Sequence, residues 1–484
     1  MNRKLRDIVV LVALSLALVW CMPALGQVLK GSISGTVTDP QGAVISGAQV
    51  KATNLETGAV YTTTSDSSGL FRFNLIPTGN YKLEIGAQGF KTSVQNKVEV
   101  TAGTDASQGT LKLAVGGGSE TVEVIGAAPL IDTTQSQITN TFSGVQLQTF
   151  TGIQENEGLD NLALFVPGIT NTRDNTFSNS NGPGFSSNGL RGRNNDQEID
   201  GQNNNDNSVG GPSLFVSDTE FVQQYVLVTN QFGPEYGRNA GSVVNIITKS
   251  GTNNWHGSLF GNENNSVLNS LTNGQKNPRI CGDNCLTQPP RLNNEFSGFT
   301  IGGPMVKNKM FIFGGFDNQL ISTQSPESTT GLTPTPAGLA TLNGCFPTSQ
   351  SLQAFNKFGP YSISAGSPHP FSDTSVRSIR SGATLCPGVQ FAGVERTLST
   401  PFHGFDWVLK NDIQLGGDTI TSRYIFNRGN NFNLDFGDGA NGYPVNVTAL
   451  SQAILESWTH NFSAHMVNEA RVSFNRLNVD FGGN

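Results

Sequence analysis

The chain of 484 residues has few charged side chains. Asp, Glu, Lys and Arg make up 13% of it, about half of the roughly 25% found in soluble domains. The net charge is −7, so no basic stripe is available to neutralise phosphates, and we exclude a nucleic-acid partner. Beyond the N-terminus there is no run of about 20 apolar residues, which excludes a spanning helix.

Histidine and cysteine are also scarce, with five residues of each. None of the histidines begins an H-E-x-x-H or H-x-x-E motif, the pairs by which a zinc peptidase holds its metal. We therefore predict that the protein is not an enzyme and that it has no cofactor and no metal site. The plentiful residues are Gly, Asn, Ser and Thr, which are poor helix formers, so we expect a mainly β fold with long polar loops.

Residues 1–26 have the features of a secretory signal peptide. A basic start is followed by the apolar run Ile8–Trp20, and small residues then precede Gln27. This pattern predicts cleavage before Gln27. Cys21 raises the alternative of a lipoprotein signal, but Trp20 is too large for the position before a lipidated cysteine.

Cleavage at that site leaves four cysteines, an even number in an oxidising compartment. Cys281 and Cys285 flank a short polar turn, and Cys345 and Cys386 bracket a segment rich in Pro, Ser and Gly. We favour two disulfides, one within each pair. A zinc site is the alternative, although no histidine or second cysteine pair is suitably spaced.

Residues 27–115 read as short strands separated by turns. Ile33 and Val37 alternate with Ser and Thr, which predicts a half-buried strand. Asp39–Gly42 and Asn54–Gly58 are turn sequences. Strands punctuated this regularly indicate an antiparallel β-sandwich.

Two runs in this segment, GTVTDPQGAVISGAQV and DSSGLFRFNLIPTGNYKLEIGAQGF, resemble a carboxypeptidase regulatory-like or starch-binding-like domain. The resemblance implies a prealbumin-like or Ig-like sandwich and, in some relatives, carbohydrate binding. Phe71, Phe73 and Tyr81 are either the core of this sandwich or a platform that stacks on a sugar. We prefer the core interpretation, because nothing marks an exposed aromatic pair.

Residues 127–253 resemble the plug domain of TonB-dependent outer-membrane receptors, in the Oar-like branch where a regulatory-like domain precedes the plug. This implies a surrounding β-barrel in the cell outer membrane. It also suggests that Arg191, Arg193, Glu235 and Arg238 make polar contacts between plug and barrel in a water-filled lumen. The matching residues are Leu190-Arg191-Gly192, Ile199-Asp200-Gly201, Glu235-Tyr236-Gly237-Arg238, Gly241–Asn245 and Thr248–Thr252.

The stretch before the plug, residues 116–126, joins a Gly-rich linker to a candidate TonB box. The box resembles the segment by which such receptors are pulled, because a β-prone strand on a tether can pair with the sheet edge of a TonB-type energy-transducing protein. The alternative is an ordinary last strand of the sandwich or first strand of the plug. The box residues are Glu120, Thr121, Val122, Glu123, Val124, Ile125 and Gly126.

Composition alone predicts that Asn171–Asn207 is a disordered loop, because it is dense in Asn, Ser and Gly. Asp196, Asp200 and Asp206 suggest a calcium site, but their spacing fits no EF-hand loop. Strands are expected at Phe221–Thr229 and Ser242–Thr248.

Residues 254–484 have the alternation of a membrane barrel. Ala470, Val472 and Phe474 alternate with polar residues, and so do the segments around Trp407 and Tyr424. Apolar residues outside and charged residues inside are expected when lipid surrounds a wet lumen. A short turn near Asn308 resembles the family's periplasmic turns, and Ile321–Pro401 reads as mostly a long extracellular loop.

We therefore predict a TonB-dependent transporter that takes up an extracellular ligand, such as a carbohydrate or peptide, with outer-membrane lipid around it. The alternative is a secreted or surface adhesin that binds carbohydrate without transport. Residues 254–484 supply roughly eight strand candidates, fewer than the about 22 strands of a plugged barrel. We expect the chain to be an N-terminal fragment of a longer protein, and not a degenerate copy that cannot close.

Overall fold

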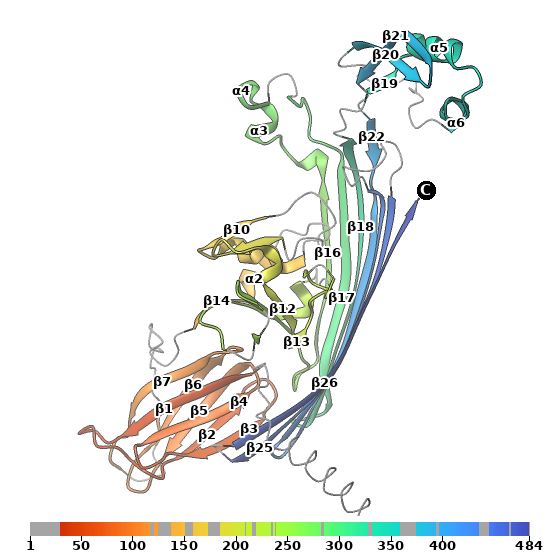
Figure 1. Ribbon diagram of the computed structural model, residues 1–484. Coiled ribbons are helices and arrows are strands. Elements are labelled where there is room, and N and C mark those ends of the chain that lie inside the picture. Colours follow the sequence, from red (N-terminus) through yellow and green to blue (C-terminus); the bar gives the residue numbers. More distant parts are fainter. Residues whose placement is uncertain are drawn as a thin grey trace, which may run out of the picture.

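The computed structural model contains three successive units (Figure 1). They are a β-sandwich, a central unit and a wall of long strands. None of the described helices is long and apolar enough to cross a membrane. The described residues are 30–116, 121–123, 137–150, 158–172, 184–208, 210–214, 219–233, 236–237, 239–281, 285–327, 332–358, 374–393, 396–434, 445–463 and 466–483.

The first unit, called the sandwich, packs two sheets face to face, one in the order β4-β1-β7 and one in the order β3-β2-β5-β6-β8. Phe71, Phe73 and Tyr81 lie in the core between them, so these rings offer no exposed face to a sugar and the core interpretation is confirmed. The strands are β1 (Gly31–Thr38), β2 (Gln49–Asn54), β3 (Val60–Thr64), β4 (Leu70–Ile76), β5 (Gly79–Gly86), β6 (Thr92–Val100), β7 (Asp105–Lys112) and β8 (Thr121–Glu123).

The first strand differs from its prediction, because β1 is buried on both faces. The hydroxyls of Ser32 and Ser34 donate to the Asp105 carboxylate at 3.0 and 2.7 Å. With β4 on one side and β7 on the other, β1 is a central strand. Its polar face can be buried because a carboxylate accepts the hydrogen bonds of both serines.

The second unit, called the central unit, is built on a five-stranded sheet in the order β13-β12-β15-β14-β9. Strands β14 and β15 confirm the two predicted strands. The elements of this unit are β9 (Ile138–Ser143), α2 (Val145–Phe150), η1 (Gly158–Phe165), β10 (Ile169–Asn171), β11 (Phe185–Ser187), η2 (Gly192–Asn194), β12 (Asp196–Ile199), β13 (Gln202–Asn203), η3 (Thr219–Phe221), β14 (Val222–Asn230) and β15 (Val243–Thr248).

The disorder predicted for Asn171–Asn207 is wrong for the part that the structure describes, because this stretch contains β11, β12 and β13. The three aspartates there have separate partners. Asp196 accepts from Asn205, Asp206 accepts from Ser208, and Asp200 pairs with the wall. They therefore form no joint calcium site, and no group of three or more metal-ligating side chains occurs among the described residues.

The third unit, called the wall, is a row of seven antiparallel strands, with β22 (Arg396–Ser399) paired beside β18. Neighbouring strands are linked by short turns at one end, as at Asn308 between β17 and β18 and at Gly416-Gly417 between β23 and β24. The sandwich lies at this short-turn end (Figure 1). The seven strands are β16 (His256–Asn265), β17 (Leu292–Val306), β18 (Met310–Glu327), β23 (Phe402–Leu415), β24 (Asp418–Leu434), β25 (Val445–Ser463) and β26 (Met466–Gly483).

Side chains of the wall alternate as predicted. Val472 and Phe474 are 75% and 56% exposed on the outer face, whereas Lys410 and Arg423 are buried on the inner face. This is the inverse of a soluble sheet, since the exposed face is the apolar one. The pattern is the one predicted for a membrane barrel from the sequence.

At the other end of the wall the chain makes long connections. The connection after β16 contains α3 (Asn273–Lys276) and α4 (Pro278–Cys281). The connection after β18 is a small folded subdomain, called the outer subdomain, and not mostly a loop as predicted for Ile321–Pro401. Its elements are β19 (Leu332–Pro334), α5 (Pro336–Cys345), α6 (Gln350–Phe358), β20 (Thr374–Ser381) and β21 (Thr384–Gly393).

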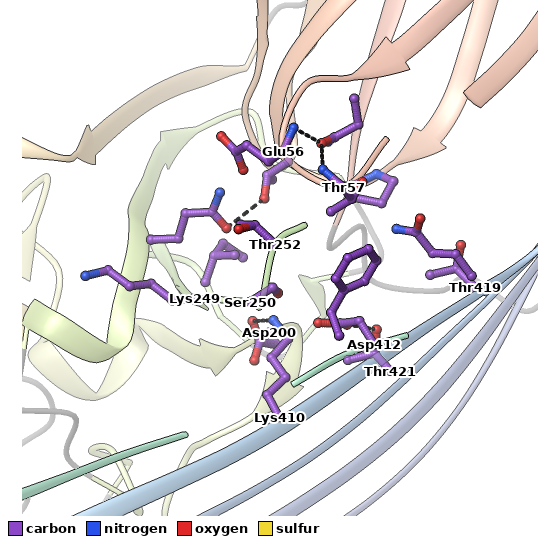
Figure 2. A pocket seen from close by; sticks show the side chains of 18 of the residues that line it. Glu56, Thr57, Asp200, Lys249, Ser250, Thr252, Lys410, Asp412, Thr419 and Thr421 are labelled. Atoms are coloured by element: carbon purple, nitrogen blue, oxygen red, sulfur yellow. Dashed lines mark hydrogen bonds and ion pairs between the residues drawn. The ribbon is translucent and has the colours of Figure 1, made fainter. Parts of the chain in front are cut away.

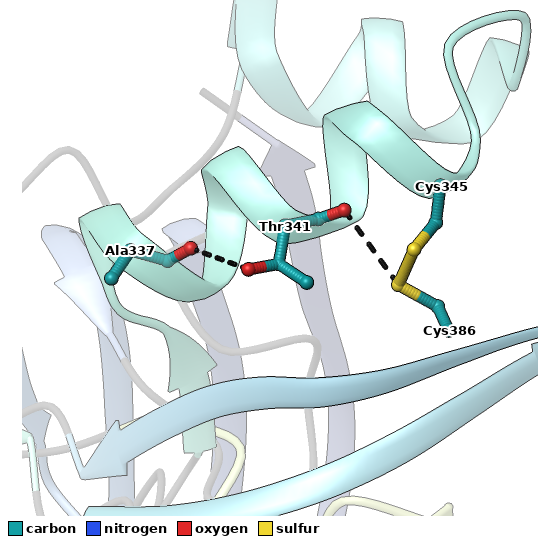
Figure 3. The surroundings of a disulfide bond; sticks show 4 residues. All are labelled: Ala337, Thr341, Cys345 and Cys386. Atoms are coloured by element: carbon teal, nitrogen blue, oxygen red, sulfur yellow. Dashed lines mark hydrogen bonds between the residues drawn. A yellow bond between two sulfur atoms is a disulfide. The ribbon is translucent and has the colours of Figure 1, made fainter.

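The outer subdomain folds around a small core of its own. Cys345 at the end of α5 is bonded to Cys386 in β21 (Figure 3), which is the pairing favoured from the sequence. The core also contains Leu342 and Val389. A disulfide and a few apolar side chains thus order a segment that its composition alone describes as a loop.

Candidate functional site

A tight hairpin carries the central unit to the wall. Strands β12 and β13 pair with Ile199 opposite Gln202, so Asp200 and Gly201 form a two-residue connection. Both residues have positive φ, at 47° and 65°, as a type I′ turn requires. Asp tolerates this left-handed conformation and Gly adopts it freely, which is why the Asp-Gly sequence forms the hairpin here.

The carboxylate of Asp200 is the centre of the contact. It accepts from the Thr248 backbone N–H at 2.9 Å and the Thr248 hydroxyl at 2.6 Å. Arg423 of the wall lies 2.8 Å from it and Lys410 lies 3.8 Å away. The side chains of Asp200 and Arg423 are 4% and 0% exposed, so solvent does not screen this ion pair.

Two opposing effects set the protonation of Asp200. Burial raises the pKa of this carboxyl, but the cations Lys410 and Arg423, together with the hydrogen bonds from Thr248, hold its pKa below the ordinary value. The carboxylate is therefore ionised at neutral pH. It neutralises part of the positive charge that β23 and β24 present to the interior.

Side chains around the hairpin add directional bonds. Arg423 also donates to the Ile199 carbonyl at 2.8 Å, and Arg471 donates to the Gly201 carbonyl at 2.8 Å. Gln202 donates to the Ile454 carbonyl at 3.1 Å and accepts from Arg423. The tip of the hairpin is thus bonded to three wall strands, β24, β25 and β26.

Beside these polar contacts lies a buried apolar part of the interface. Tyr225, Leu227 and Val244 of the central unit share one buried apolar cluster with Val408 and Ile425 of the wall. The expectation of a water-filled space between plug and barrel is therefore wrong for this contact. Apolar side chains of the wall point inward here because the central unit offers them apolar partners.

A cavity of about 250 Å³ lies where all three units meet. In Figure 2, Glu56 and Thr57 of the sandwich face Thr252, and Asp412 and Thr419 of the wall line the same space. Lys30 also lines it, and its ammonium donates to the Thr459 hydroxyl at 2.6 Å. Burial lowers the pKa of Lys30 to about 8, against the attraction of nearby carboxylates.

Comparison with known proteins identifies two of the three units. Residues 32–114 match the carboxypeptidase regulatory-like domain, and residues 247–484 match the outer membrane beta barrel domain. The chain is also 29% identical over 326 residues to the TonB-dependent transporter Oar of Myxococcus xanthus. The chain is therefore a relative of the TonB-dependent outer-membrane transporters. The alignment covers 65% of this chain and 29% of the Oar transporter, so the chain spans less than a third of that relative.

Solved receptor structures are similar at low identity. The siderophore receptor PirA from Pseudomonas aeruginosa is 12% identical, with a TM-score of 0.28, and the alignment covers 71% of this chain and 55% of PirA. The alcaligin receptor FauA from Bordetella pertussis is 10% identical, with a TM-score of 0.34, and the alignment covers 72% of this chain and 49% of FauA.

The barrel family and the Oar relative locate this protein in the cell outer membrane, as predicted. Because outer-membrane barrels have short periplasmic turns, the prediction that the long connections of the wall are extracellular places its short-turn end in the periplasm, and this orientation stays a prediction. The Oar relative is a transporter and not an enzyme, in line with the sequence prediction.

The contacts predicted between plug and barrel for Arg191, Arg193, Glu235 and Arg238 are not tested by the described structure. Arg191 and Arg193 are exposed, and Glu235 and Arg238 lie outside the described residues, so their contacts with the barrel stay a prediction. The sequence placed Asp200 in the plug motif Ile199-Asp200-Gly201 and suggested it as a calcium ligand, but did not indicate that it contacts the wall. Its signal was present in the inward charges of β23 and β24, which require a counter-charge on whatever fills the barrel.

Only part of the candidate TonB box is described. Thr121–Glu123 form β8, which pairs in parallel with Thr92–Val94 of β6. Glu120 and the stretch 124–126 lie outside the described residues. The segment is therefore an edge strand of the sandwich in this conformation, and its role as a box stays a prediction.

The structure describes the remaining cysteines only in part and does not describe the predicted signal peptide. Cys285 is disulfide-bonded, whereas the side chain of Cys281 is outside the described part of the chain. Residues 1–26 are outside it as well, so cleavage before Gln27 stays a prediction.

Proposed function

We propose that this protein is a TonB-dependent transporter in which the central unit is the plug of a β-barrel. The observation that supports this most directly is the buried contact of Asp200 with Arg423 and Lys410. A charged pair without solvent is costly unless both partners are held in place. This pair lies on the inner face of a wall whose outer face is apolar.

We propose that energy enters through Glu120–Gly126. β8 is the last strand of its sheet in the described structure, and such a strand can offer backbone groups to a partner's sheet edge. The partner is a TonB-type energy-transducing protein in the periplasm, the compartment in which the sandwich lies.

The ligand that we propose is an uncharged polar molecule, either a carbohydrate or a peptide. The extracellular connection between β18 and β23 has few charged side chains, so it offers little attraction to a strongly charged ligand. Equilibrium binding of the detergent-solubilised protein to neutral oligosaccharides and uncharged peptides tests this. Tighter binding of an anionic iron chelate than of any neutral ligand would contradict it.

Proline substitution tests the energy coupling. Val122→Pro and Val124→Pro each remove a backbone N–H that strand pairing needs, so both variants should lose cross-linking to the TonB-type partner. Thr121→Ser keeps the backbone intact and should cross-link like the unchanged protein. If both proline variants cross-link normally, the segment is only a strand of the sandwich and the proposed coupling is wrong.

A further inference from the structure

We propose that the sandwich is a periplasmic clamp that joins the central unit to the wall, and that a pull on β8 displaces this clamp before it unseats the central unit. The inference rests on the proposed function. It extends that function by giving the sandwich a place in the force path.

The strongest contact of the clamp is made by Asn253, in the connection from the central unit to the wall. Its backbone N–H donates to the Glu56 carbonyl at 2.9 Å and its side-chain amide donates to the Thr57 carbonyl at 2.7 Å. Its side-chain oxygen accepts from the Asn308 backbone N–H at 2.8 Å. One residue thus ties a turn of the sandwich to a periplasmic turn of the wall.

Two further loops of the sandwich contact the central unit directly. The Thr78 hydroxyl donates to the Gln223 side chain at 3.3 Å, and the Ala102 backbone N–H donates to the Gln224 side chain at 3.2 Å. Ala102 also packs in one buried cluster with Val226 and other residues of β14 and β15. The sandwich therefore rests on the same sheet that carries Asp200.

The sandwich also contacts the wall itself. Lys30 is buried and donates to Thr459 of β25 at 2.6 Å. Tyr61 of β3 is hydrogen-bonded to Thr419 of β24, and its burial raises the pKa of its phenol to about 12. The wall contacts are polar, and the core of the sandwich is separate from the core of the central unit. An interface of this kind can open and close reversibly.

The pairing of β8 places the clamp in the force path. Thr121–Glu123 are hydrogen-bonded to β6, so a partner that pulls on β8 loads the sheet of the sandwich through this pairing. Along the chain, β8 is joined to the central unit through residues 124–136. The sandwich is held by separate hydrogen bonds and by the small apolar cluster around Ala102, whereas the central unit is held by a buried ion pair and a larger shared apolar cluster. The clamp is therefore the weaker attachment and should release first.

Cysteine labelling in living cells tests the clamp. The full-length protein is expressed with Thr78→Cys or Thr57→Cys. Both residues line the cavity where the three units meet. A small thiol reagent that enters the periplasm should label both sites about fivefold faster in energised cells that contain the TonB-type partner than in cells without it. Both residues are half-buried in the docked sandwich and become more accessible when it is displaced. Ser46→Cys, an exposed site on the same sandwich, should be labelled equally in both.

The outcomes separate this inference from the proposed function. Cross-linking of the protein to the partner is measured in the same cells. If cross-linking occurs but neither site changes its labelling rate, the clamp is wrong and the proposed function stands. If only one site changes, a single loop is moving and the clamp is also wrong. If cross-linking and both changes in labelling are absent, both proposals fail.

Discussion

At the level of single residues, Asp200 makes the central contact between the central unit and the wall. Its carboxylate lies between Thr248 of its own unit and two cations of the wall. An aspartate in this position lets Arg423 and Lys410 be buried, because each cation would otherwise face an apolar interior without a counter-charge. The residue therefore determines where the central unit sits as well as how tightly.

Asp200→Asn should weaken the seating of the central unit by about 3–5 kcal/mol, because Arg423 then stays buried without its carboxylate. The measurement is hydrogen exchange of the amides of β12 and β15 in the detergent-solubilised protein. Lys249→Gln is the control, since its ion pair with Glu220 is partly exposed and should contribute less than about 1 kcal/mol. If the two substitutions have equal effects on hydrogen exchange, the buried ion pair contributes no more stability than the partly exposed one.

The lowered pKa of Asp200 also gives this contribution a pH window. The folded-state pKa is below the ordinary value of 3.8. The stabilisation is therefore present above that value and is lost as the pH falls through the lower folded-state pKa.

Lys30 should make the docking of the sandwich stronger at alkaline pH. Burial lowers its pKa from 10.5 to about 8, so docking disfavours the charged form. Below pH 8 the full penalty of about 3 kcal/mol applies, and it disappears as the pH rises towards 10.5. The thermal midpoint of the sandwich within the whole protein should rise across this range, and the slope should vanish in Lys30→Met. If the thermal midpoint of the Lys30→Met variant still rises with pH, another titratable group causes the pH dependence.

At the level of elements, the hairpin β12–β13 shows how a polar, Asn-rich stretch becomes ordered. The backbone of Asp196–Ile199 pairs in parallel with Val243–Ile246. The Asn204 side chain donates to the Leu214 carbonyl at 2.8 Å and accepts from its N–H at 3.0 Å. Asn side chains that would be solvated in an isolated peptide here satisfy buried backbone groups.

Gly201→Val should unfold or displace this hairpin. A β-branched residue at φ 65° costs about 1–2 kcal/mol or more in backbone strain, and displacement of the turn moves the carbonyl that accepts from Arg471. Gly201→Asn is the matched control, because Asn tolerates the left-handed region. We expect faster hydrogen exchange of Gln197–Asn203 in the Val variant alone. Similar exchange in both variants would show that the positive φ does not restrict which residue can occupy position 201.

At the level of the whole molecule, the three units differ in how far each depends on the others. The sandwich has a closed core of its own, with Ile33, Leu83 and Val100 among the buried residues. The central unit shares its core with the wall. The wall strands β16 and β26 end the described row without a further neighbour, and open strand edges need a partner in lipid.

The sandwich should therefore fold when Gln27–Gly116 is expressed alone. Its thermal unfolding, followed by circular dichroism, should be cooperative. Phe71→Ala should lower its stability by about 3–5 kcal/mol, because Phe71 is 1% exposed in the core. Leu55→Ala, at an exposed position, should leave the midpoint nearly unchanged. A gradual transition in the unsubstituted fragment would mean that the sandwich needs its contacts with the wall.

The sequence by itself determined the features that repeat locally. Period-two alternation is a property of each strand, so it predicted the apolar outer face of the wall. The Val, Ile and Tyr content of two segments predicted strands β14 and β15. Motif resemblance gave the order of the units, and turn residues such as Asp39–Gly42 predicted where strands end. The pairing of Cys345 with Cys386 was only favoured from their positions, because four cysteines allow three pairings, and the structure decided it.

Only the tertiary structure decided which polar residues meet. Asp200 and Arg423 are separated by more than two hundred positions, and no local pattern selects Asp200 over Arg191 or Arg193 as the partner of the wall. The order within Asn171–Asn207 and in the outer subdomain arose in the same way. Their backbone groups gain hydrogen-bond partners, and their few apolar side chains gain a core, only when distant segments come together. The free energy that offsets their loss of conformational entropy therefore comes from tertiary contacts, which the sequence pattern of each segment does not reveal.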